Sequence, residues 1–133
     1  MAQQITTGQW NRTLLHRQHL LQRVAEDAIE VLDRCVGLQA QDPRAPFFGF
    51  ASRITDFAPQ ELDELLTGRE VVRMAMLRST IFLMDAEDAR WVRPLVQPTL
   101  DAELATHARR LVGVRSAEVA ADAAELLAGR SLS

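Results

Sequence analysis

The stretch EVVRMAMLRSTIFLM, residues 70–84, decides the fold because the period of the hydrophobic pattern changes there. Apolar residues alternate between two faces over residues 70–77, and residues 80–84 form a second apolar run, which is typical of two β-strands. Arg78 and Ser79 separate the two runs, although Arg-Ser is not a preferred two-residue turn. The pattern predicts an antiparallel β-hairpin.

Three helical segments are predicted before the hairpin. The first is capped by Thr6 or Thr7 and runs to about Arg23, the second begins at Asp27 and closes at Gly37, and the third begins at Pro59 and ends at Gly68. The large side chains of the first segment that are predicted to face inward are Trp10, Leu14, Leu15 and Leu21. Residues 43–50, rich in proline and phenylalanine, indicate a packed loop that can contain a helical turn.

Further helices are predicted after the hairpin. Asp85 caps a helix that Pro94 and Pro98 break, Pro98 opens another helix, and Ser116 caps a last helix over residues 117–128. Residues 129–133 combine a helix stop with a new helix-start signal, so we interpret the chain as a fragment of a longer protein.

Three helices followed by a two-stranded antiparallel hairpin is the element order of a winged-helix domain. The predicted fold is therefore mainly α with a small antiparallel β-hairpin, a winged helix-turn-helix followed by additional helices. We place the winged-helix domain at residues 6–84. Residues 85–133 would form a helical extension that leads into a truncated second winged-helix domain.

Composition sets limits on the partners and the location of the protein. All 15 basic residues are arginine, and the formal net charge is −3. The arginine bias fits either bidentate phosphate contacts or the codon usage of a GC-rich genome, and the negative net charge favours codon usage. The single cysteine, Cys35, lies on the apolar side of a helical pattern, which predicts a buried small hydrophobe in a reducing cytoplasm. The sequence shows no signal peptide and no membrane-spanning run, so we expect a cytoplasmic protein without a membrane partner.

The charge pattern favours the hairpin over the third helix as a nucleic-acid surface. Glu61, Asp63 and Glu64 are predicted to point outward from the third helix, where phosphates would repel them. Arg73 and Arg78 lie on the hairpin and are better suited to DNA. The alternative for most of these arginines is a surface ion pair with a nearby acid.

The histidines predict no metal site. His16 and His19 have a metal-like spacing on a helix, but no third ligand follows at a useful distance. His107 lies near the apolar stripe of its helix and is predicted to be packed and not catalytic. No cofactor is predicted, because the sequence has no phosphate-binding glycine loop, catalytic triad or cysteine-pair motif.

The segment GLQAQDPRAP, residues 37–46, places Gln39 and Gln41 on either side of a small residue just after the second helix. In extended backbone, residues i and i+2 point to the same side, so both amides would face one small target. Such a pair can hold a water or the polar edge of a ligand. The alternative is that the amides satisfy backbone groups of the loop.

This segment carries a resemblance to the winged-helix DNA-binding family that includes the AlkZ and YcaQ DNA glycosylases, which act on alkylated bases and interstrand crosslinks. The matching stretches are NRTLL at 11–15, HRQHL at 16–20, residues 37–46, Val72-Arg73, Arg78-Ser79-Thr80, and Asp88 with Arg90-Trp91. The resemblance spans nearly the whole chain. Family members are longer, with tandem winged helices and a C-terminal β-rich domain, so this chain would lack the C-terminal domains of its parent protein.

The resemblance implies an activity and a set of site residues. The catalytic Gln-x-Gln motif of the family maps onto Gln39 and Gln41. The candidate DNA contacts in the matching stretches are Arg44, Arg73, Arg78 and Thr80. The implied partner is damaged double-stranded DNA, and the implied reaction releases N7-alkylated purines or crosslinked bases. Phe82 is a departure, because many members have a histidine at that position. The alternative function is a non-catalytic winged-helix module that binds DNA or protein, as a regulator or an inactive remnant.

Overall fold

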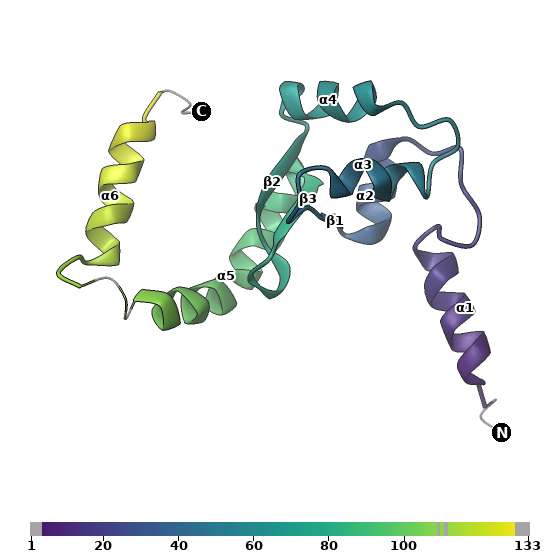
Figure 1. The fold of residues 1–133 in the computed structure, drawn as a ribbon, viewed down its shortest axis with the longest axis horizontal. Coiled ribbons are helices and arrows are strands. Elements are labelled where there is room, and N and C mark those ends of the chain that lie inside the picture. The colour runs from purple at the N-terminus through teal and green to yellow at the C-terminus, as the bar shows by residue number, and fades with distance from the viewer. Residues whose placement is uncertain (1–3, 109, 111, 130–133) are drawn as a thin grey trace.

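A computed structural model describes residues 4–108, 110 and 112–129 of the chain. These residues form six α-helices, a small three-stranded antiparallel sheet and one short 3₁₀ segment (Figure 1). In chain order the elements are α1 (Thr7–Arg17), α2 (Ala28–Cys35), β1 (Leu38–Gln39), α3 (Ala45–Ala51), α4 (Pro59–Gly68), β2 (Val71–Ala75), η1 (Leu77–Ser79), β3 (Ile81–Asp85), α5 (Ala86–Ala108) and α6 (Ser116–Leu127). The predicted class, mainly α with a small antiparallel β-hairpin, is confirmed.

The sheet has the order β1-β3-β2, so it contains an edge strand in addition to the predicted hairpin. β2 pairs with β3 as the hairpin, and β1 pairs along the other side of β3. Leu38 lies opposite Leu83, and Gln39 lies opposite Phe82. A strand of two residues has too few positions to show an alternating pattern, which is why no strand was predicted there.

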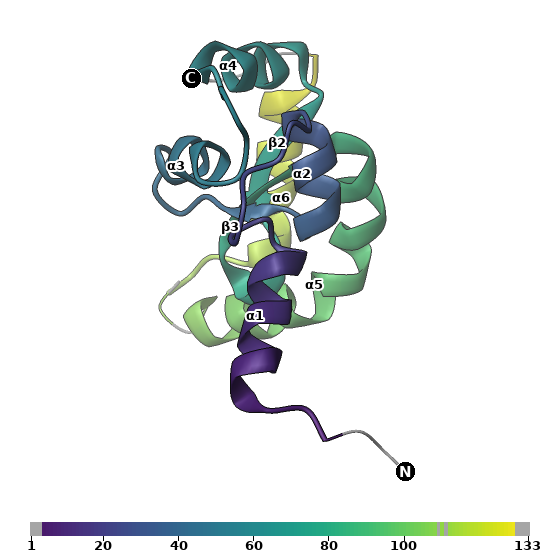
Figure 2. The same ribbon diagram turned by 90° about the vertical axis from the view of Figure 1, so that its right-hand side faces the viewer.

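The two faces of the sheet pack against different helices, because alternate strand residues point to opposite sides. Leu83 belongs to the larger core, which includes Leu32 of α2 and Phe50 of α3. Met84 belongs to a smaller core with Ala89 of α5. Figure 2 shows α3 and α4 on one side of the strands and α5 on the other.

The segment between the second and third predicted helices contains α3, a full helix where the sequence indicated a loop with a helical turn. Pro46 occupies the first turn of α3, where the missing N–H costs nothing because it has no intrahelical partner. Phe50 is fully buried and anchors α3 to the larger core.

α4 begins at Pro59 and ends at Gly68, as predicted. Its acidic face differs from the prediction at one position. Asp63 and Glu64 are exposed, but Glu61 is half-buried and its Oε1 accepts the N–H of Ala28 at 2.9 Å. Glu61 therefore holds the start of α2 against α4, because the first N–H groups of a helix have no intrahelical partner.

The hairpin turns at Arg78 and Ser79, as predicted. Both residues have left-handed backbone, with φ of 54° and 57°, and the Thr80 N–H donates to the Leu77 carbonyl at 3.1 Å. Left-handed backbone at both central positions is the geometry of the two-residue turns that match strand twist. Asn and Gly adopt it most easily, and this hairpin reaches it with less favourable residues.

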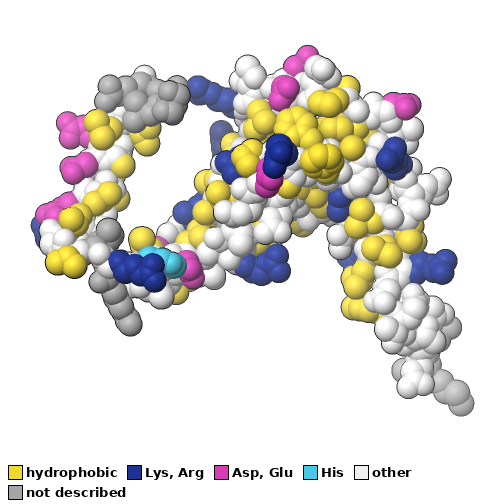
Figure 3. All heavy atoms as spheres, in the orientation of Figure 1, with side chains coloured by type: hydrophobic (Ala, Val, Ile, Leu, Met, Phe, Trp, Pro, Cys, Tyr) yellow, Lys and Arg dark blue, Asp and Glu magenta, His cyan; other side chains and the backbone are white. Residues whose placement is uncertain are grey.

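α1 is shorter and less buried than predicted. Its Thr6 cap is present, but the helix ends at Arg17 and not near Arg23. None of its side chains is buried, and Trp10 remains 55% exposed. The prediction that Trp10, Leu14, Leu15 and Leu21 face a core is wrong, because α1 extends away from the sheet and the helices that cover it (Figures 1 and 3).

α5 continues through Pro94 and Pro98, so the predicted break at these prolines is wrong. Each proline removes one intrahelical hydrogen bond and crowds the preceding turn, which bends a helix more readily than it stops one of this length. Figure 2 shows α5 changing direction along its course.

α6 begins at Ser116, within one residue of the predicted start, and buries none of its side chains. The new helix-start signal predicted after Gly129 falls on residues 130–133, which lie outside the described residues.

Candidate functional site

A cavity of about 560 Å³ lies along β1. We call it the β1 cavity. It draws its lining from α1, α2, β1, the end of α3, the hairpin turn and β3, through Leu14, Arg17, Gln18, Arg34, Cys35, Gly37, Leu38, Gln39, Arg53, Arg78 and Phe82. Its volume falls within the range of about 300–1,000 Å³ that is usual for ligand-binding pockets.

Gln39 presents an unoccupied amide to this cavity. It is exposed on β1, directly opposite Phe82 on β3, and residues opposite one another in a sheet point to the same face. No described residue makes a hydrogen bond to its side chain. The amide can therefore offer one acceptor and two N–H donors to a water or a ligand.

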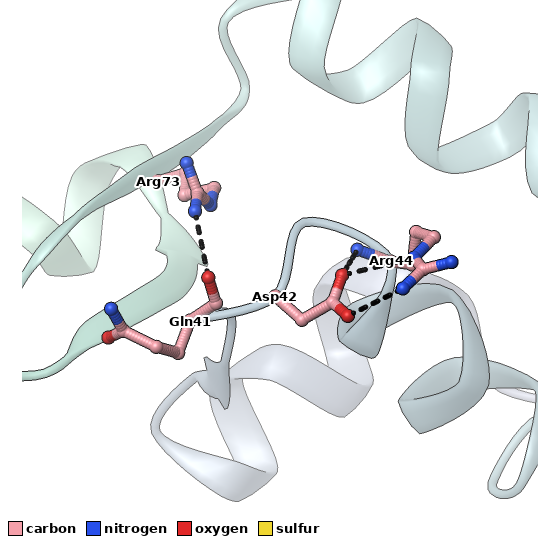
Figure 4. A network of polar contacts seen from close by, with 4 residues as sticks. All are labelled: Gln41, Asp42, Arg44 and Arg73. Carbon is pink, nitrogen blue, oxygen red and sulfur yellow. Dashed lines mark hydrogen bonds and ion pairs between the residues drawn. The ribbon is translucent and has the colours of Figure 1, made fainter.

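Gln41 is used differently. Its Oε1 accepts the Ile81 N–H at 3.2 Å, next to the bond from the Ala40 N–H to the Ile81 carbonyl at 2.8 Å. The side chain thus extends the pairing of β1 with β3 by one further hydrogen bond. Gln41 does not line the β1 cavity, and Figure 4 shows its side chain pointing away from Asp42 and Arg44. The structure therefore brings Gln39, and not the glutamine pair, to the cavity.

Four arginines line the β1 cavity, and no acidic residue does. Among the described residues, Arg17, Arg34, Arg53 and Arg78 have no carboxylate within 4.0 Å. Arg34 Nε donates to His19 Nε2 at 3.1 Å, and Arg53 Nη1 donates to the Gly49 carbonyl at 2.8 Å. The cavity is therefore electropositive, although the whole chain has a net charge of −3.

The predicted DNA contacts other than Arg78 make internal contacts. Arg73 crosses from β2 to the end of β1, where its Nε donates to the Ala40 carbonyl at 2.9 Å and its Nη2 to the Gln41 carbonyl at 3.3 Å (Figure 4). The Thr80 hydroxyl donates to the Leu77 carbonyl at 3.0 Å. Of the four predicted contacts, the structure places only Arg78 at the cavity that holds Gln39.

Asp42 and Arg44 form a local pair in the loop after β1. Arg44 donates to the carboxylate through Nε, Nη2 and its backbone N–H, at 2.9–3.2 Å (Figure 4). The side-chain hydrogen bond from Arg44 holds the pKa of Asp42 below its ordinary value, so the carboxylate is ionised at neutral pH. Asp42 does not line the β1 cavity.

Three of the cavity arginines were not singled out from the sequence. Arg17 and Arg34 lie on two different helices and Arg53 lies in the turn after α3, and the spacing between them in the chain follows no motif. The nearest signal was the matching HRQHL stretch, which contains Arg17. Only the fold brings these side chains together.

The remaining candidates have ordinary environments. His19 is buried at 6% exposure and accepts a hydrogen bond from Arg34. His107 is 57% exposed, so its predicted packing is wrong, because that part of α5 lies beyond the sheet. Cys35 is only half-buried, because it lies where α2 meets the cavity. Nowhere in residues 4–108, 110 and 112–129 do three or more His, Cys, Asp or Glu side chains gather to hold a metal ion.

Comparison with known proteins supplies a family. A family model described as DNA glycosylase AlkZ-like matches residues 32–133, which include β1, the hairpin and both glutamines. Comparisons with curated proteins and with solved structures gave no match. Within the described part of the chain, no helix is long and apolar enough to cross a membrane. Because the family match covers more than half of the sequence, the chain belongs to the AlkZ-like DNA glycosylase family.

Proposed function

We propose that this chain binds damaged double-stranded DNA and takes part in hydrolysing the N-glycosidic bond of N7-alkylated purines, with Gln39 as the residue that orients the attacking water. The observation that carries the proposal is the unoccupied Gln39 amide in a cavity lined by four arginines. The neutral Gln39 amide can contact the reacting sugar, and the arginines beside it can attract the negatively charged DNA that carries this sugar. Membership of the AlkZ-like DNA glycosylase family supports DNA as the substrate.

The architecture supports a winged helix. The element order α2-β1-α3-α4-β2-β3, with the sheet order β1-β3-β2, gives three helices and a hairpin around the larger core. We assign residues 6–84 to this domain, with α1 contributing to the β1 cavity and not to the core. The proposal assigns α5 and α6 to the helical extension that follows this domain. The acidic residues Asp63 and Glu64 on the exposed face of α4 favour DNA approach from the cavity side over insertion of α4 into the major groove.

The chemistry suits an amide. An N7-alkylated purine is already cationic, so it leaves without a strong acid to protonate it. The enzyme must instead favour an oxocarbenium-like sugar and hold a water near its anomeric carbon. Gln39 can orient that water through its carbonyl oxygen, although an amide is no strong general base.

Two neighbours of Gln39 have supporting roles in the proposal. The carbonyl oxygen of the Gln41 side chain accepts the Ile81 N–H and so holds the end of β1 to β3, which positions Gln39. Phe82 stands opposite Gln39, at the position where many relatives have a histidine. Phe82 has no titrating group, so this position adds no imidazole to the lining of the cavity.

The test is release of free base from a duplex that carries one N7-methylguanine. The 133-residue chain is incubated with the duplex, and released base is quantified by chromatography against the spontaneous rate. We expect release by the wild type, a loss of at least about 100-fold in Gln39→Ala, and wild-type release in Gln60→Ala, an exposed glutamine of α4 that does not line the cavity. Equal release by Gln39→Ala, or none by the wild type, overturns the glycosylase proposal. Duplex binding without release would favour the non-catalytic DNA-binding module.

A further inference from the structure

We propose that the β1 cavity is a phosphodiester-binding site, in which Arg17, Arg34 and Arg78 grip the backbone of the DNA strand beside the nucleotide presented to Gln39. This inference deepens the proposed function and rests on it for the identity of the strand. It assigns a ligand class to residues from α1, α2 and the hairpin turn that act together only in the folded chain.

The arginines of the cavity have no directly paired carboxylate. Glu26 Oε2 lies 3.3 Å from His19 Nε2, the nitrogen to which Arg34 donates. None of the lining residues of the cavity is acidic, and no described carboxylate reaches its guanidinium groups. Arg44, a short distance along the chain, shows the opposite case, because Asp42 occupies it through three hydrogen bonds. Positive charges that line one cavity without a counter-ion raise the free energy of the folded protein unless a ligand supplies the negative charge.

The donors that are free in the cavity match a phosphate. The side chains of Arg17 and Arg78 make no hydrogen bond to any described residue, so the whole fork of each is available. Arg34 uses Nε on His19 and keeps both terminal nitrogens. A planar guanidinium can donate two parallel N–H bonds to two oxygens of one phosphate.

Arg53 has a different role in this site. Its Nη1 is held by the Gly49 carbonyl and the Ser52 hydroxyl, and its Nε is buried without a hydrogen-bond partner. We assign Arg53 as a fixed positive charge in the cavity wall. It attracts an anion, but its side chain is held in place and cannot reorient towards the anion.

The covalent structure of DNA connects this site to Gln39. Each deoxyribose is bonded to a phosphate on both sides, so a phosphate held in the cavity brings a neighbouring anomeric carbon towards the Gln39 amide in the same lining. The phosphates also neutralise the guanidinium groups, which would otherwise disfavour a cationic sugar nearby. The cavity volume of about 560 Å³ has room for a nucleotide unit and not only for one ion.

The experiment measures how salt weakens binding to undamaged duplex DNA, so it does not depend on base release. Fluorescence anisotropy gives the dissociation constant of a labelled duplex over a series of NaCl concentrations. Each phosphate contact contributes about 0.9 to the slope of log K against log salt. We expect the triple variant R17Q/R34Q/R78Q to lose about 2–3 from that slope. The matched control is R69Q/R90Q/R93Q, which removes the same charge from a second cavity, between β2 and α5.

The control variant distinguishes a specific contact between the cavity arginines and DNA from an effect of the total charge of the protein. A slope that falls only in the cavity variant supports the proposal, provided that both variants keep the wild-type circular dichroism spectrum and melting temperature. Equal losses in the two triple variants, or no loss in the cavity variant, overturn it. Competition with inorganic phosphate at constant ionic strength tests the source of the ligand. Displacement of the duplex by millimolar phosphate from the wild type would show a free-phosphate site and contradict the assignment to DNA.

The outcome is distinguishable from failure of the proposed function. A cavity-dependent slope without any base release would leave the phosphodiester site standing and remove the glycosylase proposal. Base release that depends on Gln39, together with an unchanged slope in the cavity variant, would do the reverse.

Discussion

Two groups of arginines lie near β1, one in the β1 cavity and the other beyond the end of the strand. Their guanidinium groups differ in the partners that they contact. In the β1 cavity, Arg17, Arg34 and Arg78 have no acidic partner among the described residues and keep free donors. Beyond the end of the strand, Arg73 donates to two backbone carbonyls and Arg44 is occupied by Asp42. Residue type and sequence position therefore do not separate ligand contacts from hydrogen bonds within the protein. What separates them is whether the folded chain already supplies the acceptors.

Replacing Arg73 should have the largest effect on stability. Arg73→Met removes both donors from the Ala40 and Gln41 carbonyls, so we expect the free energy of unfolding to fall by about 2 kcal/mol. Urea unfolding measures this loss. The salt slope of duplex binding should stay at the wild-type value, because an internally tied arginine neutralises no phosphate. A stable variant with a reduced slope would place Arg73 among the DNA contacts and contradict its assignment as an internal hydrogen-bond donor.

Replacing Gln41 should have a smaller effect of the same kind. Gln41→Ala removes the acceptor of the Ile81 N–H at the end of the β1 pairing, and we expect a loss of about 1 kcal/mol in the same unfolding experiment. Base release should fall less than in Gln39→Ala, because the strand is loosened while the cavity amide remains. Gln60→Ala serves as the control, and a Gln41→Ala variant with full stability and no release would make Gln41 a direct participant.

Arg78→Gly should move stability and binding in opposite directions. Glycine adopts the left-handed backbone of this turn without the Cβ penalty, so we expect a gain of about 0.5–1 kcal/mol in unfolding free energy. DNA affinity should fall, with a slope smaller by about 0.9. A destabilised variant would show that Arg78 holds the turn and is not a free cavity arginine.

The smallest effect is expected for Asp42→Asn. The pKa of Asp42 lies below its ordinary value because of the hydrogen bond from Arg44, so its contribution to stability is present above the unfolded pKa. That contribution is lost only as the pH falls through the lower, folded pKa, and the pair stays intact from pH 5 to 8. Asp42→Asn removes the pair at any pH and releases Arg44, so duplex affinity at low salt should rise by about two- to fivefold. A rise of 100-fold would mean that Asp42 repels DNA directly.

Local patterns predicted the elements whose ends and periods are written in the chain. Pro59 and Gly68 bound α4, and the alternation over residues 70–77 with the apolar run at 80–84 specifies the hairpin. β1 could not be predicted from the sequence, because two residues define no period. An amphipathic pattern predicts which side of a helix is apolar but not which element packs against that side. Trp10 of α1 was therefore predicted to face a core, although it is exposed.

The residues of the candidate site also differ in whether the sequence could predict them. Gln39 and Gln41 were found through a short contiguous motif, and the hairpin pattern pointed to Arg78. Arg17, Arg34 and Arg53 could not be found, because the cavity joins positions from two helices and the turn after α3. The different use of the two glutamines was equally hidden, since it depends on which amide meets the edge of β3.

The most direct test of the account is to measure binding and chemistry together in Gln39→Ala. Single-turnover release of N7-methylguanine gives the rate, and anisotropy with the same duplex gives the affinity and its salt slope. We expect a rate at least about 100-fold below the wild type with unchanged affinity and slope, because Gln39 acts on the water while the arginines hold the strand. An unchanged rate, or a loss of affinity as large as the loss of rate, would contradict it.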